Sequence, residues 1–210
     1  MIRWQIDEHP TPAQIDEIAA ALEAEKVILL PTDTIYGLHA LARSQAAVDR
    51  IVAVKGREET KPFIVLVSSV DQLEALGVAA TPDLLEALGD IWPAPLTTIL
   101  PLRSPIPASR GAATLAVRIP ALDWLRALLV RTGPLVSTSA NRSGDPAVEH
   151  PFLLARELQS GIDGIADAGT RTGEASAILD LTSDEPRFIR ESELFFTQNL
   201  WKTLLKKQVL

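Results

Sequence analysis

Hydrophobic and polar positions along the chain follow two periods, one typical of helices and one of buried strands. Apolar residues recur at helical spacing after Thr11-Pro12-Ala13-Gln14, a capping box with proline at the first helical position, and predict a helix to about Glu25. The apolar run at residues 27–30 then predicts one buried strand. Pro31 should end this strand, because proline has no N–H to donate to a neighbouring strand.

The same two patterns continue through the rest of the chain. Ser44 is placed to cap a second helix and Gly56 to end it, and Thr81-Pro82 starts another. Continuous apolar runs predict further strands, at residues 63–67, 96–100, 114–119, 134–137, 176–181 and 187–189, besides a short one after the polar residues 32–34. Helices are also expected at residues 121–130, 151–159 and 193–207, the last one amphipathic and packed on the protein's own core.

Strands alternate with helices along the whole chain, and no linker or repeat divides it, which predicts a single α/β domain over residues 1–210. Its core would span about residues 11–190, and residues 191–210 would form the C-terminal amphipathic helix and tail. Connections as short as the one after Pro31 join antiparallel strands, so we expect a mixed sheet.

Composition narrows the class of protein. Of the 210 residues, 47% are hydrophobic and 22% charged, which is typical of a globular protein, and no apolar run approaches the roughly 18 residues of a membrane span. There is no cysteine, and the N-terminus lacks the apolar core of a signal peptide, so we expect a cytoplasmic protein without disulfides or membrane attachment. His9, His39 and His150 show no metal-ligand spacing, and we expect them on the surface or in loops.

The charge is negative overall but uneven. The net charge of −7, from 20 Lys and Arg against 27 Asp and Glu, argues against broad nucleic-acid binding, which needs a basic surface. Residues 43–61 differ, with five basic and three acidic side chains, so that this segment carries +2 and the remainder −9. A local basic site on an acidic protein suits a small anionic ligand better than a duplex.

Hydrogen-bonding groups gather where the strand at residues 27–30 ends. Thr32, Asp33 and Thr34 bring two hydroxyls and a carboxylate, and Tyr36 and a glycine follow. Ligands bind at strand ends in α/β proteins, which makes this element a candidate site. A turn built by Asx or Ser/Thr side chains accounts for the same residues without any ligand.

Three cations follow the predicted second helix. Lys55 and Arg57 flank Gly56, and Lys61 lies four residues beyond Arg57. A solvated helix end would also carry cations, because they suit the helix dipole. As a functional set, arginine binding bidentately and lysine acting as a point charge would clamp nucleotide phosphates. The Walker pattern Gly-x-x-x-x-Gly-Lys-Ser/Thr does not occur.

Arg118 stands inside the otherwise apolar run Leu115-Ala116-Val117-Arg118-Ile119. A buried cation is costly unless it is paired. A structural salt bridge would supply the partner, and so would an anionic group of a substrate, such as a carboxylate. The sequence leaves both interpretations open.

Ser137, Ser139 and Asn141 alternate along a polar segment, so an extended backbone would point them to one side. A polar turn explains them equally well. Ser-x-Asn also occurs in penicillin-binding hydrolases, but that chemistry needs Ser-x-x-Lys and Lys-Thr-Gly motifs, and neither is present. We therefore interpret these residues as hydrogen-bonding groups for a substrate or nucleotide.

Taken together, Pro31-Thr32-Asp33-Thr34, Lys55-Gly56-Arg57 and the segments at residues 115–120 and 137–141 resemble the signature of the YrdC/Sua5 family. They come in the family's order and at compatible spacings, and the resemblance runs from about residue 27 to 190. It implies the YrdC-like fold, a twisted open mixed sheet flanked by helices with a concave ligand-binding face.

The resemblance also implies an activity. Enzymes of this family make L-threonylcarbamoyladenylate from L-threonine, bicarbonate or CO2 and ATP, releasing pyrophosphate, for N6-threonylcarbamoyladenosine in tRNA. Magnesium would arrive with ATP, and no tightly bound protein metal is expected. A downstream tRNA threonylcarbamoyl transferase is the implied partner, and weak binding of tRNA itself is left open.

Site residues carry over from the resemblance position by position. Those implied to bind L-threonine are Thr34, Arg118, Ser137 and Ser176. Those implied to bind the nucleotide are Lys55, Arg57, Lys61, Thr114, Ser139, Asn141 and Arg190. Catalysis would rest on positioning and on the cations Lys55, Arg57 and Arg118, with Asp33 shaping the turn.

Several positions depart from the family pattern. Ala177 replaces a threonine after Ser176, Leu66 stands where many members have a substrate-contacting histidine, Ala94 replaces a glycine, and Glu191-Ser192 replaces Pro-Gly. A related carbamoyl-adenylate enzyme with another acceptor therefore stays open. So does an RNA-binding module on the concave face, although such a module needs basic residues with interleaved aromatics, and only 5% of residues are aromatic.

Overall fold

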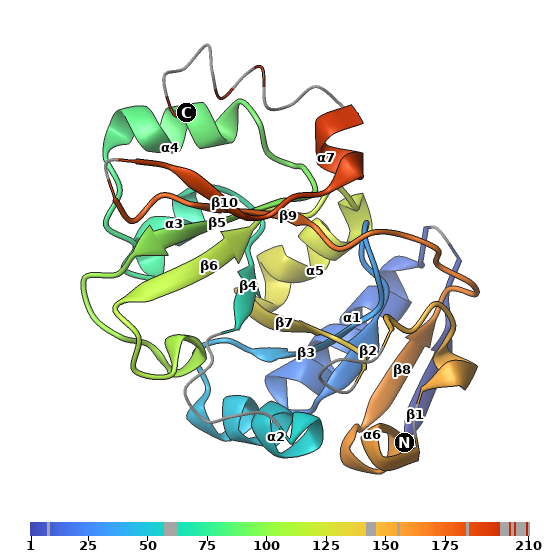
Figure 1. Ribbon diagram of the computed structural model, residues 1–210. Helices are drawn as coiled ribbons and strands as arrows, with labels where there is room; N and C mark the ends of the chain where they lie inside the picture. The colour runs from blue at the N-terminus through green and yellow to red at the C-terminus, as the bar shows by residue number, and fades with distance from the viewer. Residues whose placement is uncertain are drawn as a thin grey trace.

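Strands and helices alternate in the computed structural model, which describes residues 1–7, 9–56, 63–141, 146–154, 156–183 and 185–197, with Lys202, Leu204 and Val209 (Figure 1). The strands are β1 Ile2–Gln5, β2 Ile28–Leu30, β3 Gly37–Leu41, β4 Ile64–Leu66, β5 Leu96–Pro101, β6 Thr114–Arg118, β7 Leu135–Ser139, β8 Gly164–Asp167, β9 Ala177–Asp180 and β10 Arg187–Arg190. The helices are α1 Pro12–Glu23, α2 Gln45–Lys55, α3 Asp71–Ala75, α4 Pro82–Gly89, α5 Asp123–Thr132, α6 Arg156–Gly161 and α7 Glu193–Thr197, with short 3-10 turns at Pro107–Ser109 and Pro151–Leu153.

Within the described residues, ten strands form one sheet in the order β1-β8-β2-β3-β7-β4-β6-β5-β9-β10. Four neighbouring pairs are parallel, namely β1 with β8, β8 with β2, β4 with β6 and β5 with β9, and the others are antiparallel. The mixed sheet expected from the short connections is therefore confirmed. In the same part of the chain, no helix is both long and apolar enough to cross a membrane.

Local sequence signals explain where the first helices begin and end. Thr11 accepts a hydrogen bond from the Gln14 N–H at 3.3 Å, and the Gln14 side chain accepts one from the Thr11 N–H at 2.8 Å, as the capping box predicts. Ser44 caps α2, and Gly56 ends it in the left-handed conformation at φ 55°, which glycine adopts without steric cost.

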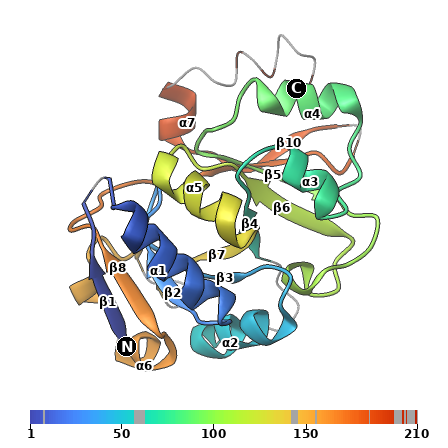
Figure 2. The ribbon, with the colours of Figure 1, turned by 180° about the vertical axis from the view of Figure 1, so that it is seen from behind.

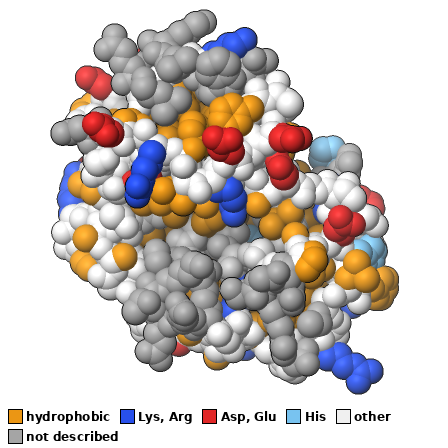
Figure 3. Space-filling model, viewed as in Figure 1, with side chains coloured by type: hydrophobic (Ala, Val, Ile, Leu, Met, Phe, Trp, Pro, Cys, Tyr) orange, Lys and Arg blue, Asp and Glu red, His pale blue; other side chains and the backbone are white. Residues whose placement is uncertain are grey.

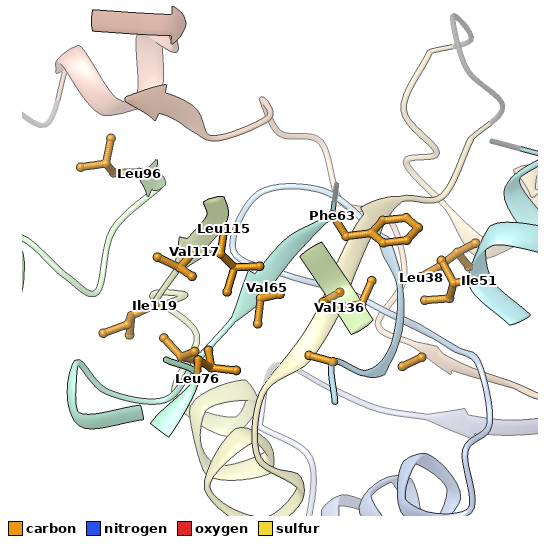
Figure 4. Close-up of a cluster of buried hydrophobic side chains, with 14 of the residues drawn as sticks. Leu38, Ile51, Phe63, Val65, Leu76, Leu96, Leu115, Val117, Ile119 and Val136 are labelled. Atoms are coloured by element: carbon orange, nitrogen blue, oxygen red, sulfur yellow. The ribbon is translucent and has the colours of Figure 1, made fainter. Parts of the chain in front are cut away.

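Two hydrophobic cores lie on opposite faces of the sheet. Successive strand residues point to opposite sides, so Val65 and Leu66 enter different cores. Helices α1 and α5 lie side by side on one face (Figure 2) and pack there against Leu30, Leu66 and Leu135. The larger core joins strand and helix residues, of which Figure 4 shows Leu38, Ile51, Phe63, Val65, Leu76, Leu96, Leu115, Val117, Ile119 and Val136.

The structure departs from the sequence predictions at several elements. Strands β1 and β8 and helix α3 were not predicted from the sequence. The helix expected at residues 151–159 is instead the 3-10 turn Pro151–Leu153 followed by α6. In the predicted C-terminal helix, α7 ends at Thr197, and residues 198–201, 203 and 205–208 lie outside the described residues. Phe195 and Leu204 are fully buried in the larger core, so the described part of this segment does pack on the protein's own core.

Strand pairing aligns a row of half-exposed residues across one face of the sheet. Ser137 pairs with Ile64, Ile64 with Ala116, Ala116 with Ile99, and Ile99 with Asp180. Paired residues project to the same face, and all five side chains are half-buried. The row therefore gives a ligand access to apolar side chains flanked by polar ones.

Phe195 tests the packing of the C-terminal segment. We expect Phe195→Ala to lower the free energy of unfolding by about 3–5 kcal/mol, because this fully buried ring packs with Phe188 and Phe196. Phe152→Ala is the matched control, because that ring is 71% exposed, and it should change stability by at most about 0.5 kcal/mol. Urea denaturation measures both, and equal effects would contradict the packing of α7 on the core.

Candidate functional site

A chain of hydroxyl groups holds the loop between β2 and β3. Thr32 Oγ1 donates to the Ile35 carbonyl at 2.7 Å and accepts from the Thr34 N–H at 3.1 Å and the Ile35 N–H at 3.2 Å. The two threonine hydroxyls also lie 2.9 Å apart, and either of them could be the donor of this contact. The turn built by Ser/Thr side chains is thus present.

Arg118 of β6 is buried against this loop. Its side chain is 4% exposed and pairs with Asp33 Oδ1 at 2.9 Å, and its other terminal nitrogen donates to Thr34 Oγ1 at 3.1 Å. Asp33 Oδ2 also accepts from the Ala121 N–H at 3.0 Å, just before α5. Burial lowers the pKa of Arg118, and the Asp33 charge opposes that shift. The structural salt bridge, one of the two interpretations of Arg118, is therefore present.

Arg190 of β10 lies beside this ion pair. It donates from Nε to the Ser176 carbonyl at 2.8 Å, and Ser176 Oγ lies 2.8 Å from Thr97 Oγ1. Burial lowers the pKa of Arg190, and the positive charge of Arg118 lowers it further. The Glu174 carboxylate opposes these shifts, so two carboxylates, Asp33 and Glu174, accompany the two guanidinium groups.

Lys55 joins the end of α2 to the end of β7. Its Nζ donates to the Ser139 carbonyl at 2.7 Å and to the Asn141 carbonyl, and lies 3.4 Å from Asn141 Oδ1. The Ser139 hydroxyl donates to the same Asn141 oxygen. Lys55, Ser139 and Asn141 are therefore brought together as predicted, whereas Arg57 and Lys61 lie outside the described residues.

Thr114 lies at the far end of β6 from Arg118. Strand pairing places Thr114 opposite Pro101. This end of β6 is level with Ser139 in β7, and Arg118 is at the opposite end of β6. Four residues of strand separate the two ends by roughly 13 Å. The candidate site is thus elongated along β6, with Arg118 at one end and Thr114 at the other. The loop that carries Thr34 contacts Arg118 but enters β3 at Gly37, which pairs with Ser139, so this loop reaches from the Arg118 end to the end of β7. Arg190, implied to bind nucleotide, lies near enough to Arg118 for that charge to lower its pKa.

His39 corrects one prediction. It lies in β3 and is fully buried, not on the surface or in a loop. Its Nε2 is 3.2 Å from the hydroxyl of Ser137, which lies between the two ends of the site. Burial lowers the pKa of His39 to about 3, with a smaller effect of the nearby Arg118 charge, so the ring is neutral at physiological pH.

Sequence reasoning did not predict how closely residues 168–176 approach the loop between β2 and β3. A Cβ added to Gly173 would lie 2.0 Å from the Thr34 carbonyl, so only glycine fits there. The Tyr36 hydroxyl donates to the Gly169 carbonyl at 2.8 Å and accepts from the Ala168 N–H at 2.9 Å. The partial motif Gly173-Glu174-Ala175-Ser176 was the available signal for this contact.

One face of the molecule mixes apolar and charged side chains. On the face seen in Figure 1, hydrophobic side chains form a band, beside which lie Lys and Arg side chains and also Asp and Glu side chains (Figure 3). Among the residues that the structure describes, no three His, Asp or Glu side chains gather in a way that could hold a metal ion.

Comparison with known proteins places the chain in a family. The model of the Sua5/YciO/YrdC family, described as "Telomere recombination", matches residues 20–192. The chain belongs to this family, as the resemblance of its motifs predicted.

Named relatives and solved structures agree with the family assignment. The threonylcarbamoyl-AMP synthase of Bacillus subtilis is 34% identical over 197 residues, covering 90% of this chain and 57% of the relative. That of Xanthomonas axonopodis pv. citri is 39% identical over 165 residues, covering 74% and 86%. The crystal structure of Pyrococcus abyssi Sua5 complexed with L-threonine aligns at a TM-score of 0.83 and 33% identity, covering 90% of this chain and 57% of that one. The chain thus spans little more than half the length of some relatives, and the fold is that of Sua5.

Asp33 tests the buried ion pair. We expect Asp33→Asn to lower the free energy of unfolding by about 3 kcal/mol, because it leaves the Arg118 guanidinium buried without a counter-charge. Asp123→Asn is the matched control, since Asp123 pairs with Arg126 but is 85% exposed, and it should cost at most about 0.5 kcal/mol. If denaturant midpoints moved equally for both variants, the ion pair would not have the assigned role.

His39 predicts acid lability. The pKa of His39 in the folded protein is about 3, below the ordinary histidine value of 6.5. Folding therefore favours the neutral ring, and this contribution to stability is lost as the pH falls from 6.5 towards 3. Wild-type stability should therefore fall relative to His39→Leu by about 1.4 kcal/mol per pH unit in that window. Urea denaturation of both proteins at several pH values measures this difference, and a constant difference would contradict it.

Proposed function

We propose that this protein makes L-threonylcarbamoyladenylate from L-threonine, bicarbonate or CO2 and ATP, releasing pyrophosphate. The observation that carries the proposal is the loop with Asp33 and Thr34, which contacts the buried Arg118 and continues to the end of β7 that holds the Lys55 cluster. Such a site matches an amino acid joined to a nucleotide. The naming of relatives as threonylcarbamoyl-AMP synthases and the threonine complex of P. abyssi Sua5 support it.

The amino acid would bind at the Arg118 end. Thr34 Oγ1, to which Arg118 donates at 3.1 Å, would accept an N–H from the substrate amine with its other lone pair. Arg118 and Arg190 supply positive charge for the carboxylate, and Ser176 and Ser137 supply hydroxyls nearby. The carboxylate would share Arg118 with Asp33 rather than replace it.

The nucleotide would bind towards Lys55, Thr114, Ser139 and Asn141. Lys55 is held by two carbonyls at the end of β7, so its charge is fixed in place there. A fixed ammonium stabilises phosphate charge without reorganisation during the reaction. Arg57 and Lys61 belong to the same proposal through the family resemblance.

The reaction would need no covalent enzyme intermediate. The threonine amine attacks CO2 and loses a proton to solvent, giving an N-carboxylate. When bicarbonate is the source, the amine proton instead leaves in the one water that is released. A carboxylate oxygen then attacks the α-phosphorus of ATP, and the bond to the β-phosphate oxygen breaks to release magnesium pyrophosphate. The protein contributes positioning and charge stabilisation. The product would serve a tRNA threonylcarbamoyl transferase downstream.

Pyrophosphate release tests the proposal directly. With ATP, magnesium and bicarbonate, the full chain should release pyrophosphate only when L-threonine is present, because threonine supplies the acceptor nitrogen. Lys55→Met should raise the KM for ATP at least about tenfold through loss of a charge-assisted contact. Lys202→Met is the matched control, since Lys202 is exposed, and its kinetics should be those of wild type.

The remaining variants and outcomes separate the alternatives. Arg118→Ala and Arg57→Ala should abolish threonine-dependent release, with circular dichroism verifying that each variant is folded. Binding of ATP without threonine-dependent release would indicate another acceptor, as the departures at Leu66 and Ala177 allow; Leu66 is 1% exposed and packs in a core. Absence of ATP binding would contradict the nucleotide assignment and favour the RNA-binding module.

A further inference from the structure

Ser137 and His39 form a cross-strand pair in the middle of the elongated site. They are paired in register between β7 and β3, and Ser137 Oγ lies 3.2 Å from His39 Nε2. The imidazole is fully buried, whereas Ser137 is half-exposed on the open row of the sheet. The serine hydroxyl therefore stands between a buried ring and the space where a ligand would bind.

The ring has its room because residue 37 is glycine. A Cβ added there would lie 2.9 Å from His39 Cε1 and 3.4 Å from Nε2. The imidazole thus leans along β3 over Gly37 and cannot be displaced without changing the contact with Ser137. The pair is held by the backbone of two strands, which makes its geometry rigid.

Hydrogen-bond accounting favours one direction of the contact. A neutral imidazole carries one N–H and one bare nitrogen, and His39 Nδ1 is buried and has no hydrogen-bond partner among the described residues. The backbone of Gly37 and Ile28 also lies close enough to the ring to raise its pKa. A buried N–H without an acceptor is rarer than an acceptor without a donor, and we therefore place the proton on Nε2, where Ser137 Oγ lies 3.2 Å away.

We propose that His39 is a positioning residue that makes the Ser137 hydroxyl a hydrogen-bond donor to an oxyanion of the bound ligand. With one lone pair taken by His39, the Ser137 O–H turns to the open face. This inference rests on the proposed function for the nature of the ligand, where the oxyanion is a carboxylate of the amino acid or a phosphate oxygen.

Kinetics of the full chain test the proposal. His39→Leu removes the Nε2 donor, and we expect the KM for one substrate to rise roughly tenfold. A rise for L-threonine assigns the oxyanion to the carboxylate, and a rise for ATP assigns it to a phosphate. His39→Gln places an amide N–H near the Nε2 position and should restore most of the lost affinity. His9→Leu is the matched control, because His9 is exposed.

A double-mutant cycle covers the case in which His39→Leu perturbs folding. In a Ser137→Ala background, the change from His39 to Leu should have no further effect on either KM, because the positioned hydroxyl is gone. Equal effects of His39→Leu with and without Ser137 would overturn the proposal. So would unchanged KM values in His39→Leu, or a Gln variant as impaired as the Leu variant.

The tautomer can be read without any substrate. In protein labelled with 15N-histidine, the nitrogen shifts of His39, assigned by comparison with His39→Gln, should show the Nε2–H form at neutral pH. The Nδ1–H form or an imidazolium would overturn the proposal. Failure of the wild-type protein to release pyrophosphate would instead contradict the proposed function, and it would leave this tautomer result as it stands.

Discussion

The buried guanidinium of Arg118 is the constraint on which the site depends. A cation with 4% of its side chain exposed must be neutralised locally, and Asp33 does this at 2.9 Å. Because Asp33 also accepts from the backbone before α5, the ion pair joins β6, the loop after β2 and the start of α5. Arg118 also donates to the Thr34 hydroxyl, so the same guanidinium group holds two neighbouring residues of this loop.

Much of the fold could be predicted because its signals are local. The caps at Thr11 and Ser44 and the left-handed Gly56 depend on a few neighbouring residues, and the structure has them as predicted. Strands β1 and β8 could not be predicted in this way. Only Trp4 of β1 is buried, and β8 begins with a glycine whose missing Cβ makes room for Trp4. Their pairing is a property of the tertiary structure.

In the site, too, local features could be predicted from the sequence and tertiary contacts could not. Alternation predicted that Ser137 and Ser139 share a side, and they do so in β7. The partners of these residues depend on which strands become neighbours, and periodicity carries no information about sheet order. For this reason His39, which stands alone among apolar residues in the sequence, was expected on the surface, although β3 places it directly beside Ser137.

Donor and acceptor directions add a constraint that positions alone do not provide. Thr34 Oγ1 accepts from Arg118, whereas Ser137 receives a proton from His39 and offers its own. A ligand that satisfies Ser137 must present an oxyanion, along a site that also contains the guanidinium groups of Arg118 and Arg190. An amino acid has such a group, and its carbamate adds a second oxyanion. A ligand without an acceptor would leave the Ser137 hydroxyl unsatisfied, at a cost of about 1–3 kcal/mol where the group is buried.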